Sequence, residues 1–165
     1  MPLKIEYKLN GILLLGGANS AAGLRSMPIR YLFADEISNW PADVDGEGDP
    51  VSLAIRRTTT FSRRKIYMSS TPTVKDVSRI EREYLASDQR RFFVPCPHCG
   101  EYQWLRWSQM KWTEGDPASA MYACEHCGTL IEERYKTQML RAGEWRATVE
   151  GSGKIAGFHL SSLYS

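Results

Sequence analysis

Several features common in proteins are missing from this 165-residue sequence, and the most informative absence is a phosphate-binding loop. Such a loop follows the pattern Gly-x-x-x-x-Gly-Lys-Ser/Thr, whose backbone N–H groups and lysine surround the phosphates. The pair Gly153-Lys154 is followed by Ile155 and has no suitable glycine upstream, and Gly16-Gly17 has no lysine after it. If the chain takes part in nucleotide chemistry, we expect half of the nucleotide site to lie outside it.

The sequence also lacks long apolar runs and a large excess of charge of one sign. No apolar stretch approaches the ~20 residues that cross a membrane, and the first residues do not have the layout of a secretion signal. The net charge of +2 is too small to indicate a nucleic-acid-binding protein by itself. We therefore expect a soluble, cytoplasmic protein without membrane contact, long enough to bury a core in one or two small domains.

Cysteine is scarce, and the four cysteines form two copies of one pattern, Cys96-Pro97-His98-Cys99-Gly100 and Cys124-Glu125-His126-Cys127-Gly128. Each knuckle ends in a glycine that permits a tight turn, and four thiolates at this spacing suit tetrahedral Zn²⁺. The alternatives are two disulfides, which suit secreted proteins, or a redox Cys-x-x-Cys, which is not expected in duplicate. We predict that His98 and His126 are exposed. The predicted ligands of a structural zinc are Cys96, Cys99, Cys124 and Cys127.

Two adjacent carboxylates, Asp35 and Glu36, follow the apolar run 31–34. Such a run is typical of a buried strand in a parallel sheet, whose chemistry lies at the carboxyl ends of its strands. Asp35 at this position can hold the Mg²⁺ of a nucleoside triphosphate, and Glu36 can orient or deprotonate the attacking water. An isolated acidic pair is more often part of a surface loop, so the rest of the chain must decide.

The first 90 residues have the pattern of an α/β fold. Residues 4–9 alternate apolar and polar, Asn10-Gly11 is typical of a two-residue hairpin turn, and residues 12–15 are apolar. The stretches 16–23 and 38–48 are predicted to be loops. Further predicted elements are strands over 31–34, 65–68 and 92–94, helices over 77–86 and 132–142, and a helix that begins at Pro50.

Two groups of side chains between these elements have alternative interpretations. Trp104, Trp107 and Trp112 surround a predicted hairpin, and we expect them to form a miniature core rather than to stack on bases. A local basic cluster can contact nucleic-acid phosphates, although a solvated helix end is the alternative. This cluster consists of Arg56, Arg57, Arg63, Arg64 and Lys65.

The motifs at 17–25, 31–36 and 69–73, followed by the two cysteine knuckles, resemble in this order the large terminase subunit of lambda-like tailed bacteriophages, the GpA family. Members of that family are ATP-driven motors that package viral DNA, with an N-terminal ATPase and a C-terminal metal-dependent nuclease. The resemblance covers essentially the whole chain but only the middle of the family's length. Residues 157–165 resemble the junction at which the nuclease domain begins.

The resemblance implies roles for individual residues. Asp35 and Glu36 resemble the Walker B pair, with Asp35 directed to Mg²⁺ and Glu36 as the catalytic carboxylate. Arg25 would contact phosphate or a neighbouring subunit, or be a surface arginine. The stretch 69–73 resembles the coupling motif, whose hydroxyls would sense the γ-phosphate and transmit its loss. Its candidate residues are Ser69, Ser70 and Thr71.

The resemblance also implies the architecture and the partners. We expect an α/β fold: a partial P-loop-type ATPase sheet that lacks its Walker A segment (1–90), then a small β-rich zinc ribbon with a helix (91–145), then a linker towards a nuclease domain (146–165). ATP and Mg²⁺ would be cofactors of the complete protein. The implied partners are double-stranded viral DNA, the small terminase subunit and the portal, in the host bacterial cytoplasm. The alternatives are a non-catalytic zinc-ribbon nucleic-acid-binding or adaptor module and an inactive prophage remnant.

Overall fold

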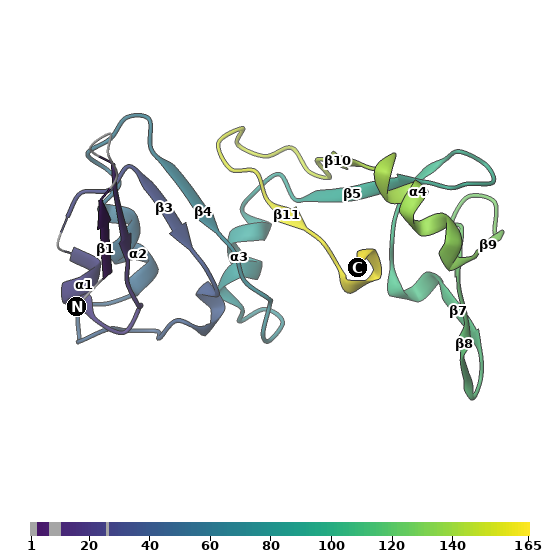
Figure 1. The fold of residues 1–165 in the computed structure, drawn as a ribbon, viewed down its shortest axis with the longest axis horizontal. Coiled ribbons are helices and arrows are strands. Elements are labelled where there is room, and N and C mark those ends of the chain that lie inside the picture. Colours follow the sequence, from purple (N-terminus) through teal and green to yellow (C-terminus); the bar gives the residue numbers. More distant parts are fainter. Residues whose placement is uncertain (1–2, 7–10, 26) are drawn as a thin grey trace. The chain divides into compact units, whose positions relative to one another are not determined.

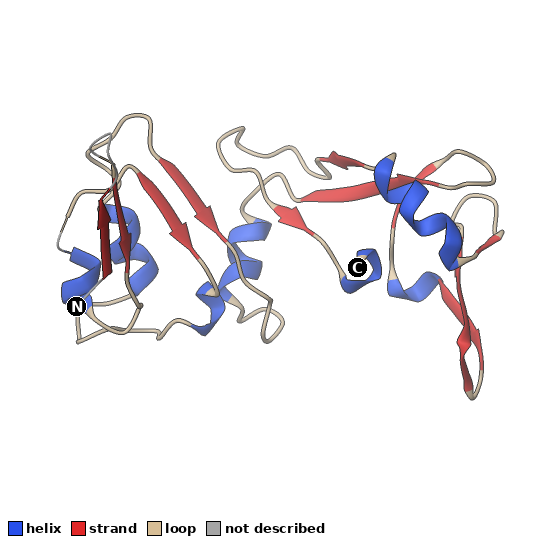
Figure 2. Ribbon diagram, in the orientation of Figure 1, coloured by secondary structure: helices blue, strands red, loops and turns tan. Residues whose placement is uncertain are grey.

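The computed structural model describes residues 3–6, 11–25 and 27–165, which form two compact units. Unit 1 is Met1–Arg82 and unit 2 is Glu83–Ser165, so the division falls inside helix α3 (Arg79–Leu85). Figures 1 and 2 show the elements of each unit. The predicted domain limits at residues 90 and 145 stay predictions. None of the helices among the described residues has the length and apolar character needed to cross a membrane.

Unit 1 contains two small sheets. Strands β1 (Leu3–Glu6) and β2 (Ile12–Leu15) pair antiparallel, as predicted for a hairpin, while Asn10 of the predicted turn lies outside the described residues. Strands β3 (Tyr31–Ala34) and β4 (Lys65–Met68) pair in parallel, with Ala34 opposite Met68. The helical elements of this unit, apart from the part of α3 that it contains, are α1 (Ala21–Arg25), the 3-10 turn η1 (Ile37–Asn39) and α2 (Pro50–Arg56).

The β3–β4 sheet is covered on one face. Leu32 and Ala34 of β3 are buried, and they pack in one cluster with Val51 of α2. The alternating residues Tyr31 and Phe33 are 53% and 75% exposed. The strand is therefore parallel, as predicted, but it is not buried on both faces, because no layer lies on its second side among the described residues of unit 1.

Two stretches predicted as loops contain helical turns. Helix α1 begins inside the stretch 16–23, with Ala21 buried and its N–H donating to Asp45 Oδ2 over 2.9 Å. Turn η1 begins at Ile37, one residue before the stretch 38–48, and ends inside that stretch at Asn39. These elements were missed because a single turn is too short to show a hydrophobic period.

Unit 2 is built around strand β5 (Arg90–Pro95). Two strands, β6 (Tyr102–Trp104) and β10 (Glu144–Arg146), pair with β5 antiparallel, and β11 (Phe158–His159) pairs with it in parallel. A second sheet has the order β7-β8-β9. The remaining elements are η2 (Trp107–Gln109), β7 (Met110–Thr113), β8 (Asp116–Ala123), β9 (Leu130–Ile131), η3 (Glu133–Tyr135), α4 (Lys136–Arg141) and η4 (Ser162–Tyr164).

The core of unit 2 joins β5 to α4 and to the last turn of the chain. Val94 and Met139 are buried in one cluster, against which Tyr164 packs. The Tyr164 hydroxyl donates to the Phe92 carbonyl over 2.6 Å. A Cβ at Gly143 would lie 2.5 Å from the Phe92 ring, so the glycine that follows α4 permits close packing. Residues 158–164 thus pack within unit 2.

Two of the three tryptophans near the β7–β8 hairpin, Trp107 in η2 and Trp112 in β7, do not form the expected core. Trp107 is 68% exposed and Trp112 is 53% exposed, with 6.0 Å between their ring centroids. The prediction of a miniature core is therefore wrong for these two residues. The core of unit 2 takes Tyr122 and Met110 from the strands of the hairpin, and neither of these two tryptophan rings is part of it.

Candidate functional site

Asp35 and Ser69 meet at the carboxyl ends of β3 and β4. Because the strands are parallel neighbours, the residues that follow them lie side by side. The Ser69 N–H donates to the Ala34 carbonyl over 2.9 Å, which continues the ladder by one residue. The Ser69 hydroxyl donates to Asp35 Oδ1 over 2.6 Å. The first residue of the predicted coupling motif therefore contacts the first residue of the predicted acidic pair.

Glu36 has a left-handed backbone with φ 52° and ψ 40°. This conformation costs a residue with a Cβ roughly 1–2 kcal/mol, and such residues concentrate at functional sites. Its N–H donates to Asp35 Oδ1 over 3.0 Å, and Asn39 Nδ2 donates to Glu36 Oε2 over 3.2 Å. Both residues of the acidic pair are exposed, so their remaining oxygens are accessible to a cation and to water.

The second coupling residue contacts the turn after the acidic pair. Ser70 Oγ accepts a hydrogen bond from the Ser38 N–H over 3.2 Å, and the Ser69 carbonyl accepts one from the Ile37 N–H over 3.3 Å. Thr71 is exposed. The segment from Ser69 to Ser70 is thus bonded to the acidic turn at three places, namely Asp35, Ile37 and Ser38.

Arg79 holds this turn in place, and our sequence analysis did not find it. Its side chain is 14% exposed and donates to the carbonyls of Ile37 (2.8 Å) and Pro41 (3.2 Å). It also forms an ion pair with Asp49 at 3.0 Å. The sequence pattern around Arg79 indicates only a helix, and a helical period carries no information about contacts with residues about forty positions away.

Asp49 links Arg79 to helix α2. Its carboxylate accepts from the Ser52 N–H over 2.9 Å and caps the helix, with Pro50 in the first turn as predicted. Burial raises the pKa of Asp49, but the hydrogen bonds from Ser52 and the charge of Arg79 outweigh burial, so the pKa lies below its ordinary value. The ionised form of Asp49 therefore stabilises this part of unit 1.

Arg25 and two members of the predicted basic cluster, Arg56 and Arg57, line one cavity of unit 1 with a volume of about 450 Å³. Glu47 of the same cavity forms an ion pair with Arg25. Burial lowers the pKa of Arg57 from its ordinary value. The other members of the cluster are exposed beside or at the start of β4 and do not line this cavity: Arg63, Arg64 and Lys65. The structure therefore divides the predicted cluster into two groups.

The four predicted metal ligands lie together in unit 2. Their Sγ atoms are all within 4.8 Å of one another, with 3.9 Å between Cys96 and Cys127 and 3.8 Å between Cys99 and Cys124. A tetrahedral Zn²⁺ with bonds of about 2.3 Å places its sulfurs about 3.8 Å apart. The donor set therefore fits a four-thiolate metal site.

The two knuckles have the same local geometry. In the first, Gly100 has φ 79° and donates to the Cys96 carbonyl over 2.9 Å, while the His98 N–H lies 3.4 Å from Cys96 Sγ. The second repeats these contacts at Cys124 and Gly128, with 3.0 Å for the carbonyl bond and 3.4 Å for the sulfur contact. Each glycine thus permits the turn that directs an N–H to a sulfur.

The electrostatics of the cluster also suit a cation. The hydroxyl and N–H of Thr129 lower the pKa of the Cys127 thiol to about 6, whereas burial raises the pKa of Cys96. At Cys99 the Glu101 N–H lowers the pKa, but burial and the neighbouring thiols outweigh it and raise the pKa to about 12. Four thiolates at this spacing repel one another, and a divalent cation offsets that repulsion. His98 and His126 are exposed, as predicted.

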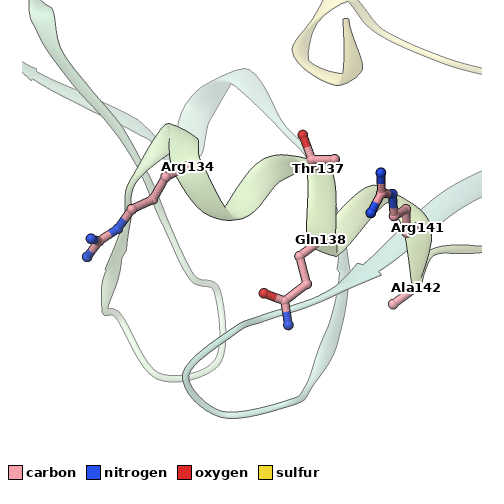
Figure 3. A pocket seen from close by; sticks show the side chains of 5 residues that line it. All are labelled: Arg134, Thr137, Gln138, Arg141 and Ala142. Carbon is pink, nitrogen blue, oxygen red and sulfur yellow. The ribbon is translucent and has the colours of Figure 1, made fainter.

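A further hollow of about 500 Å³ lies beside helix α4. Figure 3 shows the side chains that line it, Arg134, Thr137, Gln138, Arg141 and Ala142. It contains no carboxylate and no cysteine, and none of its lining residues is a predicted site residue.

Comparison with known proteins gives the family. Residues 5–145 match the family described as "Phage terminase large subunit gpA, ATPase domain". The chain belongs to this family. It is 36% identical over 130 residues to the terminase large subunit of Enterobacteria phage P21, and 34% identical over 125 residues to that of Escherichia phage lambda. These alignments cover 74% and 72% of the chain but 20% of each relative. No solved structure matches the chain.

The match to the gpA family includes the candidate residues of both units. Asp35, Glu36, Ser69 and the four cysteines all fall inside residues 5–145. The recognition from motif order is therefore confirmed. The chain spans about one fifth of the length of the two terminase relatives, so it corresponds to part of a large subunit.

Proposed function

We propose that this chain is the part of an ATP-driven viral DNA-packaging motor that carries the catalytic carboxylates and the coupling hydroxyls. The observation that carries the proposal is the 2.6 Å hydrogen bond from Ser69 Oγ to Asp35 Oδ1 at the ends of adjacent parallel strands. Chemistry in parallel sheets is placed at this edge. Membership of the gpA ATPase-domain family supports the same assignment.

The residues at this edge divide the work of ATP hydrolysis. Bound Mg²⁺ would neutralise charge on the phosphates, and Asp35 is the residue that holds it. The Ser69 hydroxyl fixes one Asp35 oxygen and leaves Oδ2 for the cation. Glu36 orients and deprotonates the attacking water. The exposed position and the left-handed backbone of Glu36 support this role.

We propose that the hydroxyl segment couples hydrolysis to movement. Ser70 is bonded to Ser38, and the Ser38 hydroxyl lies 3.1 Å from that of Ser78, which precedes helix α3. A shift at the acidic turn is therefore transmitted through two hydrogen bonds to the start of α3. Thr71 follows in the same segment and completes the proposed coupling motif.

We further propose that β3 and β4 belong to a larger P-loop-type sheet whose Walker A segment is supplied by another part of the polypeptide. The exposed face of the sheet supports this, since Phe33 and Tyr67 are 75% and 60% exposed with ring centroids 6.2 Å apart. Large apolar side chains at such a face are typical of surfaces that another layer covers. We propose that residues 1–90 form the portion of this larger sheet that the present chain contributes.

The four-cysteine cluster is proposed to be a zinc ribbon over residues 91–145, with residues 146–165 leading towards a nuclease domain. Cys96, Cys99, Cys124 and Cys127 would hold Zn²⁺, which contributes folding energy and leaves no open position for catalysis. The sulfur spacing and the duplicate knuckles support this assignment.

The proposed partners follow from the same function. Arg25 would contact a phosphate or a neighbouring subunit, and its position with Arg56 and Arg57 around one cavity supports an anion contact. The proposed contact to double-stranded viral DNA consists of Arg56, Arg57, Arg63, Arg64 and Lys65. In the whole protein, an endonuclease activity, the small terminase subunit, the portal and a place in the host bacterial cytoplasm are likewise proposals.

The test is Mg²⁺-dependent ATP turnover by a polypeptide that joins this chain to the phosphate-loop segment of a terminase large subunit. We expect turnover that requires Mg²⁺, rises with double-stranded DNA, and does not occur when either part is omitted. Asp35→Asn should abolish it, while Glu114→Gln, at the exposed turn of the β7–β8 hairpin, serves as the matched control. Turnover that survives Asp35→Asn would refute the assignment of the cation site.

A further inference from the structure

The sheet of unit 2 has two chemically different faces. Neighbours in a ladder point to the same side, so the register places Phe92 with Trp145 on one face and Arg91 with Arg146 on the other. The first face carries Phe92 and Trp145, whose ring centroids are 5.1 Å apart, with Tyr164 packed on it and Arg90 at its edge opposite Phe158. The second face, here called the arginine–aromatic face, consists of Arg91, Phe93, Tyr102, Trp104, Arg146 and His159.

Guanidinium groups on this face stack on its rings. Arg91 lies 4.6 Å from the centroid of Trp104 and 5.3 Å from that of Tyr84. Arg146 lies 4.4 Å from the centroid of Tyr102 and 5.2 Å from that of Phe93. The two arginines thus make four such contacts, three with rings of this sheet face and one with Tyr84 of helix α3.

Stacking prepares these arginines to bind an anion. It fixes the plane of each guanidinium, and the N–H groups that are not already bonded, to Glu144 from Arg146 and to Tyr84 from Arg91, can donate to a phosphate. Arg146 pairs with Glu144, but Arg91 has no carboxylate partner within the part of the chain that the structure describes. Burial and the charge of Arg91 lower the pKa of His159, which lies opposite Arg91, so the positive charge of the face comes from the two arginines, against one carboxylate.

We infer that the arginine–aromatic face binds the phosphate backbone of double-stranded DNA. Guanidinium groups already stack on its rings, which disfavours base stacking of a single strand and favours contact to a backbone. The inference rests on the proposed function for the identity of the nucleic acid, and it names a DNA contact outside the basic cluster of unit 1. Binding through phosphates is independent of base sequence and falls steeply with salt.

The test is fluorescence anisotropy of a labelled DNA duplex with the full chain over a range of salt concentrations. The double variant Arg91→Gln/Arg146→Gln should raise Kd by about tenfold or more, since a hydrogen bond to a charged group contributes about this factor. It should also lower the slope of log K against log salt by about 2. The matched control is Arg134→Gln/Arg141→Gln beside α4 (Figure 3), which removes the same charge and should change neither quantity.

Circular dichroism checks that each variant folds, and Arg146→Gln alone, at a side chain that is 42% exposed, replaces the double variant if folding is lost. Arg146→Lys should give a smaller loss than Arg146→Gln, because charge remains but the planar stack does not. Unchanged duplex affinity in the folded variant, an equal loss in the control, tighter binding of single strands, or no duplex binding by the parent chain would overturn the inference. ATP turnover is a separate readout, so these outcomes leave the proposed ATPase role to its own test.

Discussion

Ser69 and Asp35 are 34 residues apart in sequence and are joined by a 2.6 Å hydrogen bond from Ser69 Oγ to Asp35 Oδ1. The parallel pairing of β3 and β4 makes this contact possible, because it ends both strands at the same edge. The bond links two motifs that have separate proposed roles, cation binding and coupling. It therefore gives a physical reason for the two motifs to act together.

Ser69→Ala removes this bond and should lower the free energy of unfolding of unit 1 by about 1.5 kcal/mol, the lower end of the range for a hydrogen bond to a charged group, because the bond is exposed to solvent. Urea unfolding measures the change. In Ser69→Ala/Asp35→Ala the two losses should be less than additive, because each substitution removes the same contact. Ser62→Ala, in the exposed turn before β4, is the matched control. Full additivity would mean that the contact contributes nothing.

Unit 1 should lose stability in acid through Asp49. Its folded-state pKa lies below the ordinary value of 3.8, so the ionised form contributes stability above pH 3.8 that is lost as the pH falls through the lower, folded-state pKa. Asp49→Asn retains a capping side chain but has no charge, so its unfolding free energy should depend less on pH in this range. Thermal unfolding between pH 2 and 6 tests this, with Glu114→Gln as the control, and equal pH dependence in all three proteins would contradict it.

The cysteine cluster should hold one Zn²⁺ per chain, measured by elemental analysis. Chelation should unfold the core of unit 2, because a structural zinc site contributes folding energy directly. Cys127→Ser should lose the metal, whereas His98→Ala and His126→Ala should retain it, since both histidines are exposed and four sulfurs complete the shell. Metal loss in a histidine variant, with Cys127→Ser still loaded, would show a different ligand set.

The exposed tryptophans of the hairpin should contribute little to folding. Trp112→Ala should change the unfolding free energy by about 0.5 kcal/mol or less, as exposed substitutions usually do. Phe92→Ala should cost about 3 kcal/mol, because its ring packs against Trp145 and Tyr164 and fills the space that a Cβ at position 143 would take. Chemical denaturation compares them. A loss at Trp112 as large as that at Phe92 would restore the miniature core.

Local signals were sufficient for the elements that position the acidic pair. The apolar runs 31–34 and 65–68 are strands β3 and β4, and Pro50 begins helix α2. The spacing of the cysteines likewise predicted the cluster, because metal ligation imposes a local pattern on the sequence. In these cases the structure is set by residues that lie close together in the chain.

Contacts between distant residues were not predictable in the same way. Arg79 binds the turn at Ile37–Pro41, and Arg146 stacks on Tyr102, but neither arginine differs in sequence from a solvated one. Strand β11 has two residues and gains its structure from pairing with β5. The sequence also did not predict that only Arg56 and Arg57 of the basic cluster line the cavity, because this depends on where α2 ends and β4 begins.

The most direct test of the central claim is a single-turnover measurement on Glu36→Gln in the joined polypeptide, with binding and cleavage of ATP followed separately. If Glu36 is the catalytic carboxylate, the variant binds Mg²⁺-ATP with nearly unchanged affinity, and the cleavage rate falls by about 10²-fold or more, as expected for loss of a general base. Glu114→Gln should cleave ATP at the parent rate. Cleavage by Glu36→Gln at the parent rate would contradict the account.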